Sequence, residues 1–120
     1  MEQSRINDLE IYNAAFNISN KVWAIVIKWN SFEKNTLGSQ LVRAIDSVGA
    51  NIAEGYGKGS KLDNARFVKI AKGSLFETQY WLKQANVRGL INEHTFQALI
   101  LEIDNLLPRI SSYIKYLNNT

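Results

Sequence analysis

Apolar residues recur every three or four positions through four long segments of this 120-residue chain. That period places them along one side of an α-helix, in which successive side chains are about 100° apart. The segments expected to be helical are residues 5–30, 38–54, 61–87 and a last one that begins after Asn92. Helices of this length with short connections pack most simply as an antiparallel up-down-up-down four-helix bundle. The sequence therefore predicts an all-α fold.

Length and composition limit the other possibilities. With 120 residues and 46% hydrophobic content, the chain can bury one core, so we expect a single domain over residues 1–120. The absence of cysteine excludes disulfides, thiolate metal sites and thiol nucleophiles, and it favours a reducing compartment. The longest apolar run, residues 22–27, is too short to cross a bilayer, and the first residues are polar. We therefore expect a cytoplasmic protein with no membrane partner.

The first predicted helix is apolar over more than half of its circumference, which is wider than one bundle contact needs. Self-association is the most economical explanation for a second buried face. The apolar residues are Ile6, Leu9, Ile11, Ala15, Phe16, Ile18, Val22, Trp23, Ile25, Val26 and Trp29.

The second predicted helix has a narrower stripe, made of Leu41, Ile45, Val48 and Ile52. Gly55 is expected to end this helix in the left-handed conformation that glycine tolerates best. Ser60, three residues before Asp63, is expected to cap the third helix.

Excess positive charge is confined to residues 55–90. That segment has seven basic and two acidic side chains, a net charge of +5, whereas residues 1–54 (five and six) and 91–120 (two and three) are each at −1. On the third helix we expect an apolar side of Phe67, Ile70, Ala71, Ser74, Leu75, Thr78, Trp81 and Ala85. The opposite side is expected to carry a basic stripe with Phe76 and Tyr80 nearby, its cations being Lys58, Lys61, Arg66, Lys69, Lys72 and Lys83.

Gly89 is expected to break the chain before Asn92 caps the fourth helix, and Pro108 is expected to kink that helix because it has no amide hydrogen to donate. The predicted core seam of this helix is Phe96, Leu99, Ile103, Leu106, Leu107, Ile110, Ile114 and Leu117.

Nearly the whole chain resembles a known bacterial family, and the most specific motif is at its centre. The resemblance rests on Gln40, Leu41, Arg43, Ala44 and Ser47, on residues 50–55 (ANIAEG), and on Arg66, Phe67, Ile70, Ala71, Gly73, Ser74, Leu75 and Glu77. These motifs are similar to those of four-helix-bundle proteins encoded in intervening sequences of large-subunit ribosomal RNA genes, and to the accessory variability proteins of diversity-generating retroelements. The resemblance implies a homopentameric ring with a basic surface. In the retroelement branch it implies nucleic acid and a reverse transcriptase as partners, and it implies no catalytic activity.

A polar stripe lies beside the core stripe of the second helix, because Arg43, Ser47, Asn51 and Glu54 follow one another at intervals of four, four and three. We interpret it, with Glu77, as a structural frame in which Arg43 pairs with Glu54 or Glu77 and Asn51 bonds the backbone of the glycine turn. The alternative interpretation is a binding or catalytic cluster.

Several kinds of site are disfavoured by the motifs. The turn before Ser60 does not match the phosphate-loop pattern G-x-x-x-x-G-K-[ST]. Ile52 occupies the position of the first glycine, and Gly59 occupies the position of the Ser or Thr. A di-iron carboxylate site needs two histidines, and the chain has one, His94, which we expect at the surface. We expect no catalytic residues, metal or cofactor.

The basic stripe remains the best candidate site. We expect a non-enzymatic homo-oligomer that binds nucleic acid, RNA or a ribonucleoprotein rather than a specific duplex sequence, through phosphate contacts. The main alternative is a protein-interaction scaffold, such as a reverse-transcriptase accessory protein, with incidental nucleic-acid affinity. A small enzyme using Arg43, Asn51 and Glu54 is the least favoured hypothesis.

Overall fold

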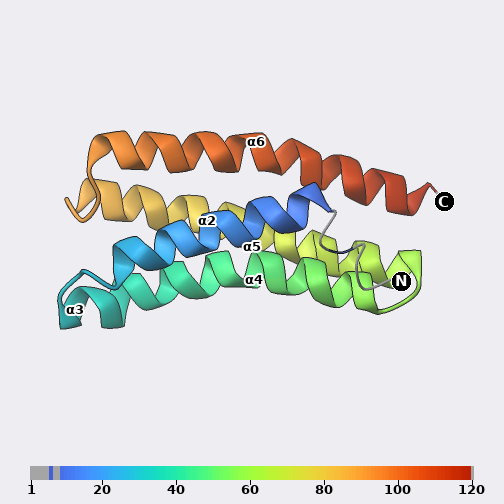
Figure 1. The fold of residues 1–120 in the computed structure, drawn as a ribbon, viewed down its shortest axis with the longest axis horizontal. Helices are drawn as coiled ribbons and strands as arrows, with labels where there is room; N and C mark the ends of the chain where they lie inside the picture. The colour runs from blue at the N-terminus through green and yellow to red at the C-terminus, as the bar shows by residue number, and fades with distance from the viewer. Residues whose placement is uncertain (1–5, 7–8, 120) are drawn as a thin grey trace.

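The computed structural model describes residue 6 and residues 9–119, and every regular element in this part of the chain is helical. Four long helices run alternately up and down an elongated bundle of 45 × 22 × 20 Å (Figure 1). They are α2 (Glu10–Val26), α4 (Ser39–Gly57), α5 (Lys61–Val87) and α6 (Glu93–Asn118). A short helix, α3 (Ser31–Glu33), and a π-helical turn, η1 (Lys34–Gly38), lead into α4. The predicted all-α four-helix bundle is confirmed.

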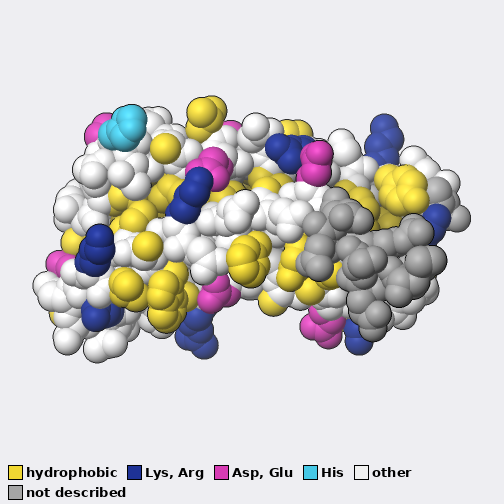
Figure 2. Space-filling view, in the orientation of Figure 1, with side chains coloured by type: hydrophobic (Ala, Val, Ile, Leu, Met, Phe, Trp, Pro, Cys, Tyr) yellow, Lys and Arg dark blue, Asp and Glu magenta, His cyan; other side chains and the backbone are white. Residues whose placement is uncertain are grey.

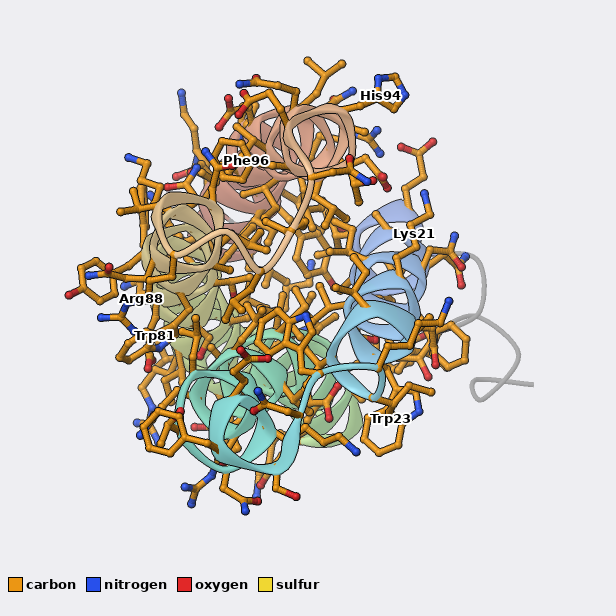
Figure 3. All side chains as sticks on the ribbon, turned by 90° about the vertical axis from the view of Figure 1, so that its left-hand side faces the viewer. Lys21, Trp23, Trp81, Arg88, His94 and Phe96 are labelled. Atoms are coloured by element: carbon orange, nitrogen blue, oxygen red, sulfur yellow. The ribbon has the colours of Figure 1, made fainter. Side chains whose placement is uncertain are left out.

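Neighbouring helices do not pack equally closely. The α4–α5 pair has the most extensive contact, followed by α5–α6 and α2–α4, whereas α2 and α6 meet along a sparse seam. The view along the bundle in Figure 3 shows the four helices around a shared core. The largest fully buried side chains come from all four of them: Ile18, Val22, Leu41, Ile45, Val48, Ile52, Leu75, Leu82, Leu99, Ile103, Leu106 and Ile110.

The first predicted helix ends earlier than expected. Its predicted start at Arg5 lies outside the described residues, and α2 ends at Val26 rather than Asn30. Asn30 instead begins the next helical segment: its Oδ1 accepts from the Glu33 amide at 2.9 Å, and Glu33 Oε1 accepts from the Asn30 amide at 3.3 Å. This reciprocal capping box satisfies two amides at a helix start, so the chain turns here.

The second predicted helix begins where expected, since α4 starts at Ser39, but it extends past the predicted end at Glu54 to Gly57. Helical structure begins at Ser31, passes through η1, and continues to Gly57. Gly55 is buried inside α4 and does not adopt the left-handed conformation. A Cβ at this position would lie 2.8 Å from Asn64 Oδ1 and 2.9 Å from Phe67 Cβ, so the glycine allows α4 and α5 to approach closely. The residue of positive φ in the turn is Gly59, at +89°.

Helix α5 has the predicted bounds, and the Ser60 Oγ accepts from the Asp63 amide at 3.1 Å as expected. Its buried side is rotated by about 60° from the predicted one at 100° per residue. Ile70 was predicted in the core but is 52% exposed, and Phe67, Ser74 and Trp81 are only half-buried. The buried residues of α5 are Asn64, Ala65, Val68, Ala71, Leu75, Thr78, Leu82 and Ala85.

The last connection and helix follow the prediction closely. Gly89 has a φ of +74°, and Asn92 Oδ1 accepts from the Thr95 amide at 2.8 Å. The predicted seam of α6 is buried except for Leu107, which is half-buried. The helix continues through Pro108 and changes direction in its second half (Figure 1). Among the described helices, none is long and apolar enough to cross a membrane.

Candidate nucleic-acid interface

The side of α5 that faces away from the core is exposed along the whole helix. We call it the α5 face, and it includes Arg88, the residue that caps the helix. It consists of Leu62, Arg66, Lys69, Ile70, Gly73, Phe76, Glu77, Tyr80, Lys83, Val87 and Arg88. Cations, large apolar side chains and the acidic Glu77 therefore share one accessible surface.

The middle of this helix carries the predicted cations that have no carboxylate partner. Lys69 and Lys83 are exposed, and Lys72 is half-buried on the flank of the face. No ion pair within the described part of the chain includes any of these three lysines. Arg66 differs, because its Nη2 lies 3.2 Å from Asp63 Oδ1. The positive charge of the face is thus strongest from Lys69 onward.

The two predicted cations nearest the α4–α5 turn are held against aromatic rings. Lys58 Nζ lies 5.3 Å from the centroid of the Phe67 ring and 3.8 Å from Glu54 Oε2. Lys61 Nζ lies 5.3 Å from the centroid of the Tyr116 ring on α6. Such cation–π contacts orient an ammonium group without removing its charge. These two lysines therefore differ from those farther along α5, because each is held by a contact within the protein.

Arg88 was not among the predicted site residues, although it belongs to the same basic segment of the sequence. It is exposed, and Figure 3 shows it on the outer side of α5 together with Trp81. The predicted apolar side of α5 was rotated toward Ile70 and Trp81, and Arg88 lies on that same side of the helix. Arg88 was therefore not recognised as an extension of the exposed basic surface by one more turn. A helical wheel centred on Val68 and Leu75 would have found it.

The central members of the polar motif join α4 to α5. Ser47 Oγ and Ser74 Oγ are 2.9 Å apart. Asn51 Nδ2 donates to the carbonyl oxygen of Ser47 at 2.8 Å and to Ser47 Oγ at 2.9 Å. The predicted bond from Asn51 to the glycine turn was wrong, because one turn of α4 supplies both acceptors.

The charged members of the motif do not form the predicted pair. Glu54 lies beside Lys58, and Glu77 Oε2 accepts from Trp81 Nε1 at 3.0 Å. Arg43 is exposed and belongs to none of the ion pairs among residues 9–119. Each carboxylate thus has a nearer partner on its own helix, and the Arg43 charge remains at the surface.

A second exposed surface runs along α2 and its C-terminal cap. Phe16, Trp23 and Ile27 are 57%, 54% and 47% exposed, and with Asn20 they follow one another at intervals of four, three and four. We call these four residues the α2 ridge. Figure 2 shows hydrophobic side chains gathered over α2 and its border with α4. Beside the ridge is a hollow floored by small residues of α4, Gly49, Ala50 and Ala53, and edged by Asp46. Partial burial raises the pKa of the Asp46 carboxyl above its ordinary value of 3.8.

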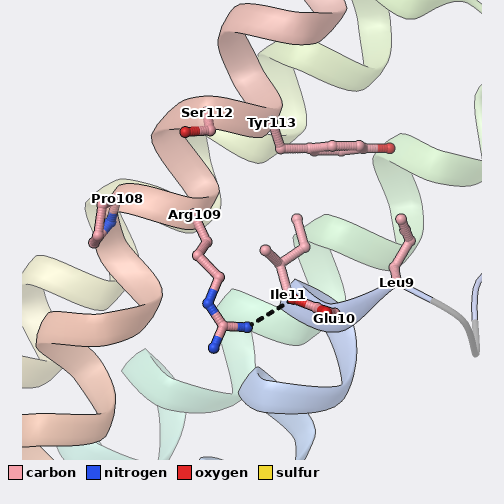
Figure 4. A pocket seen from close by; sticks show the side chains of 7 residues that line it. All are labelled: Leu9, Glu10, Ile11, Pro108, Arg109, Ser112 and Tyr113. Carbon is pink, nitrogen blue, oxygen red and sulfur yellow. Dashed lines mark hydrogen bonds and ion pairs between the residues drawn. The ribbon is translucent and has the colours of Figure 1, made fainter.

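The sparse α2–α6 seam is bridged by two ion pairs at the surface. Lys21 Nζ lies 2.8 Å from Glu102 Oε2, and Arg109 Nη1 lies 3.1 Å from Glu10 Oε1. The second pair borders an open hollow, in which burial raises the pKa of Tyr113 (Figure 4). His94 is exposed at the start of α6, as predicted (Figure 3). Within the described residues, no three His, Cys, Asp or Glu side chains gather around one possible metal position.

Comparison with known proteins agrees with the motifs around residues 43–77. The solved structure of a protein with unknown function from the S23 ribosomal protein family of Bacteroides thetaiotaomicron VPI-5482 has a TM-score of 0.77 to this one. The two are 21% identical over 88% of this chain and 98% of that chain, a likeness that shows a shared fold. A search of curated proteins gives no match. The model of the 23S rRNA-intervening sequence protein family matches residues 7–112. Since that match covers most of the chain, the protein belongs to the 23S rRNA-intervening sequence protein family.

Proposed function

We propose that this protein is a non-enzymatic homo-oligomer that binds RNA, alone or in a ribonucleoprotein, through the α5 face. The observation that carries the proposal is the set of lysines without carboxylate partners, Lys69, Lys72 and Lys83, on one accessible helix. Cations of this kind release counterions from a phosphate backbone and need no base-specific contact. A helix of 27 residues spans about 40 Å, which is enough for several phosphates.

The α2 ridge supports the homo-oligomeric part of the proposal. Two aromatic rings and an isoleucine, each about half exposed, lie along one side of α2 with the neutral Asn20 among them, and exposed apolar groups of this size often contact another protein. The resemblance to ring-forming relatives favours five copies. Residues 55–90 have a net charge of +5. In a ring, the electrostatic potentials of these segments from all copies add together and attract a polyanion more strongly.

The nature of the family supports RNA as the ligand. The family name associates its members with intervening sequences of 23S rRNA. The family name therefore makes ribosomal RNA the polyanion to test first.

A protein-interaction scaffold is the second candidate function, and the α2 ridge favours it. A ring could use exposed apolar side chains to hold another protein, such as a polymerase or reverse transcriptase, and the affinity for RNA would then be incidental. In that case, loss of the lysines on α5 would leave the partner bound.

The test measures binding of a labelled ribosomal RNA fragment by fluorescence anisotropy over a salt series, with the mass of the protein determined by light scattering. We expect a mass greater than that of one chain and an affinity that falls steeply with salt. The variant Lys69→Glu, Lys72→Glu, Lys83→Glu should lose binding and keep its mass. The control Lys28→Glu, Lys34→Glu, Lys115→Glu changes net charge equally with exposed lysines outside α5 and should still bind. Equal loss in both variants, or binding that salt does not weaken, would reject the α5 face.

A further inference from the structure

Gly73 lies at the centre of the α5 face, and no contact among the described residues explains it. The residue is in the middle of a 27-residue helix, has no positive φ and is exposed. A Cβ added there would meet no atom within 4 Å. Glycine inside a helix is less stable than alanine, because the unfolded chain loses more conformational freedom. Close packing within the fold, which accounts for Gly55, does not account for Gly73.

Large side chains flank this glycine on the same side of the helix. Lys69, Phe76 and Tyr80 are four residues before, three after and seven after it, so all four positions fall within about 60° of arc. Phe76 and Tyr80 are 52% and 53% exposed. Gly73 is therefore a low point in an otherwise bulky row, with a cation on one side and two aromatic rings on the other.

The Tyr80 ring is held in place although it is exposed. It packs edge-on against Trp81, with ring centroids 4.9 Å apart, and its hydroxyl oxygen accepts from Gln84 Nε2 at 3.0 Å. A ring that is fixed while one face is open to solvent loses little entropy when a planar group stacks on it. Nucleic-acid bases are the planar groups that commonly accompany phosphates.

We infer that an unpaired stretch of RNA crosses α5 at Gly73, with its phosphates on Lys69 and Lys72 and two bases stacked on Phe76 and Tyr80. This inference rests on the function proposed above and adds the kind of RNA. The absent side chain at Gly73 allows the backbone of the strand to touch the helix. The rings of residues 76 and 80 are one turn apart, about 6 Å along the axis.

That spacing selects against duplex RNA. Stacked nucleotides in a helical strand follow one another at about 3.4 Å, and their faces are covered by their neighbours. Residues 76 and 80 differ by about 6 Å in rise along the helix, so rings that extend from both positions can each take a base only where the strand is unstacked. A helix of a second copy is the competing occupant of the gap at Gly73. An α5 helix of that copy fits less well, because Lys69, Lys72 and Lys83 would face a helix whose two carboxylates, Asp63 and Glu77, already contact Arg66 and Trp81.

The first experiment compares a labelled 20-nucleotide oligouridine with a duplex RNA of the same length over a salt series. The wild-type protein should bind the single strand more tightly. In Phe76→Leu, Tyr80→Leu, which keeps apolar bulk but removes both rings, single-strand affinity should fall about tenfold or more, as stacking energies indicate. Its salt dependence and its duplex binding should not change. Phe32→Leu, which removes an exposed ring outside α5, is the matched control and should bind like the wild type.

The second experiment uses Gly73→Ala. This variant should melt at a higher temperature than the wild type, because alanine favours the helix and nothing obstructs its Cβ. It should nevertheless bind oligouridine several-fold more weakly, at unchanged mass. Gly49→Ala is the matched control: its Cβ would be 3.8 Å from Ala15 Cβ, an ordinary contact, so it should gain stability and bind normally.

The outcomes separate the two proposals. If neither RNA binds the wild-type protein in a salt-dependent manner, the proposed function fails. If both RNAs bind equally and the ring and glycine variants bind like the wild type, RNA binding stands and the unpaired-strand inference is overturned. If Gly73→Ala changes the mass of the assembly, the gap is a contact between copies, and the inference is again overturned.

Discussion

The α2 ridge and the α5 face both bring large apolar side chains to the surface, but they differ in what lies between those side chains. On α2 the intervening residue is the neutral Asn20, and no charged residue belongs to the ridge. On α5, Lys69 and Lys83 flank the rings of Phe76 and Tyr80. A neutral apolar surface gains most by contacting another apolar surface, whereas cations among the rings retain water and favour an anionic partner. The charge between exposed apolar residues, more than their number, indicates the partner.

Removing the ridge should have the largest effect. In Phe16→Glu, Trp23→Glu, two charges replace half-exposed rings, so association between copies should be lost while the helical bundle remains folded. Light scattering should give the mass of one chain, and circular dichroism should still show a cooperative helical transition. Phe32→Glu, Leu101→Glu places the same charges on exposed apolar positions outside the ridge and should leave the assembly intact. If the ridge variant still forms an oligomer, the proposal that α2 mediates self-association while α5 binds RNA would be contradicted.

The two sides of α5 should differ strongly in their contribution to stability. Leu75 is fully buried, so Leu75→Ala should lower the free energy of unfolding by about 2–5 kcal/mol. Ile70 is half exposed on the α5 face, and Ile70→Ala should change the free energy of unfolding by no more than about 0.5 kcal/mol. Urea unfolding monitored by circular dichroism measures both values. Similar losses of stability in the two variants would show that Ile70 is in the core, as the sequence analysis predicted.

One lysine on the α5 face should change the salt dependence of RNA binding by about one phosphate contact. Lys69→Gln should reduce the slope of log affinity against log salt by about 0.7 for a single strand. The mass and the melting temperature should not change, because Lys69 is exposed and has no ion-pair partner among the residues described. Lys28→Gln, outside α5, is the control with the same charge change. A slope that both variants share would show that net charge, not position, governs binding.

The smallest effect should come from Asp46, beside the α2 ridge. Burial raises the pKa of this carboxyl in the folded protein, so the folded state holds the proton more tightly than the unfolded state. The associated stability is present below the ordinary pKa of 3.8 and is lost as pH rises through the folded value. Asp46→Asn removes this loss, so the variant should gain stability relative to the wild type as pH is raised from about 3 to about 6. Urea unfolding measures the stability of both proteins at each pH. A stability difference that does not change as pH is raised from about 3 to about 6 would contradict this prediction.

Features set by neighbouring residues could be predicted from the sequence. The bounds of α5 follow from Ser60 with Asp63 at one end and from Gly89 at the other, and both signals act over a few residues. The core stripe of α4 was also predicted correctly, because its apolar residues occupy one narrow side. Local chemistry was sufficient for these elements.

Features set by contacts between helices could not be predicted. Gly55 has the local signature of a helix end, but the approach of Asn64 and Phe67 from α5 determines its role. The buried side of α5 was misplaced because apolar residues occur on both of its sides, so periodicity alone permits more than one rotation. Among the site residues, the partners of Glu54 and Glu77 depend on which side chain is nearest in space, and spacing along the sequence does not specify that.

The sparse seam between α2 and α6 gives the bundle an uneven resistance to local unfolding. Its two ion pairs, Lys21 with Glu102 and Arg109 with Glu10, are at the surface, where such pairs contribute little. In a single protomer, α2 is therefore held mainly by α4, and its amide hydrogens should exchange with solvent sooner than those of the closely packed α4–α5 pair. Covering the α2 ridge with a neighbouring copy would slow that exchange. If copies associate through the ridge as proposed, the order of the first long helix would depend on the concentration of the protein itself.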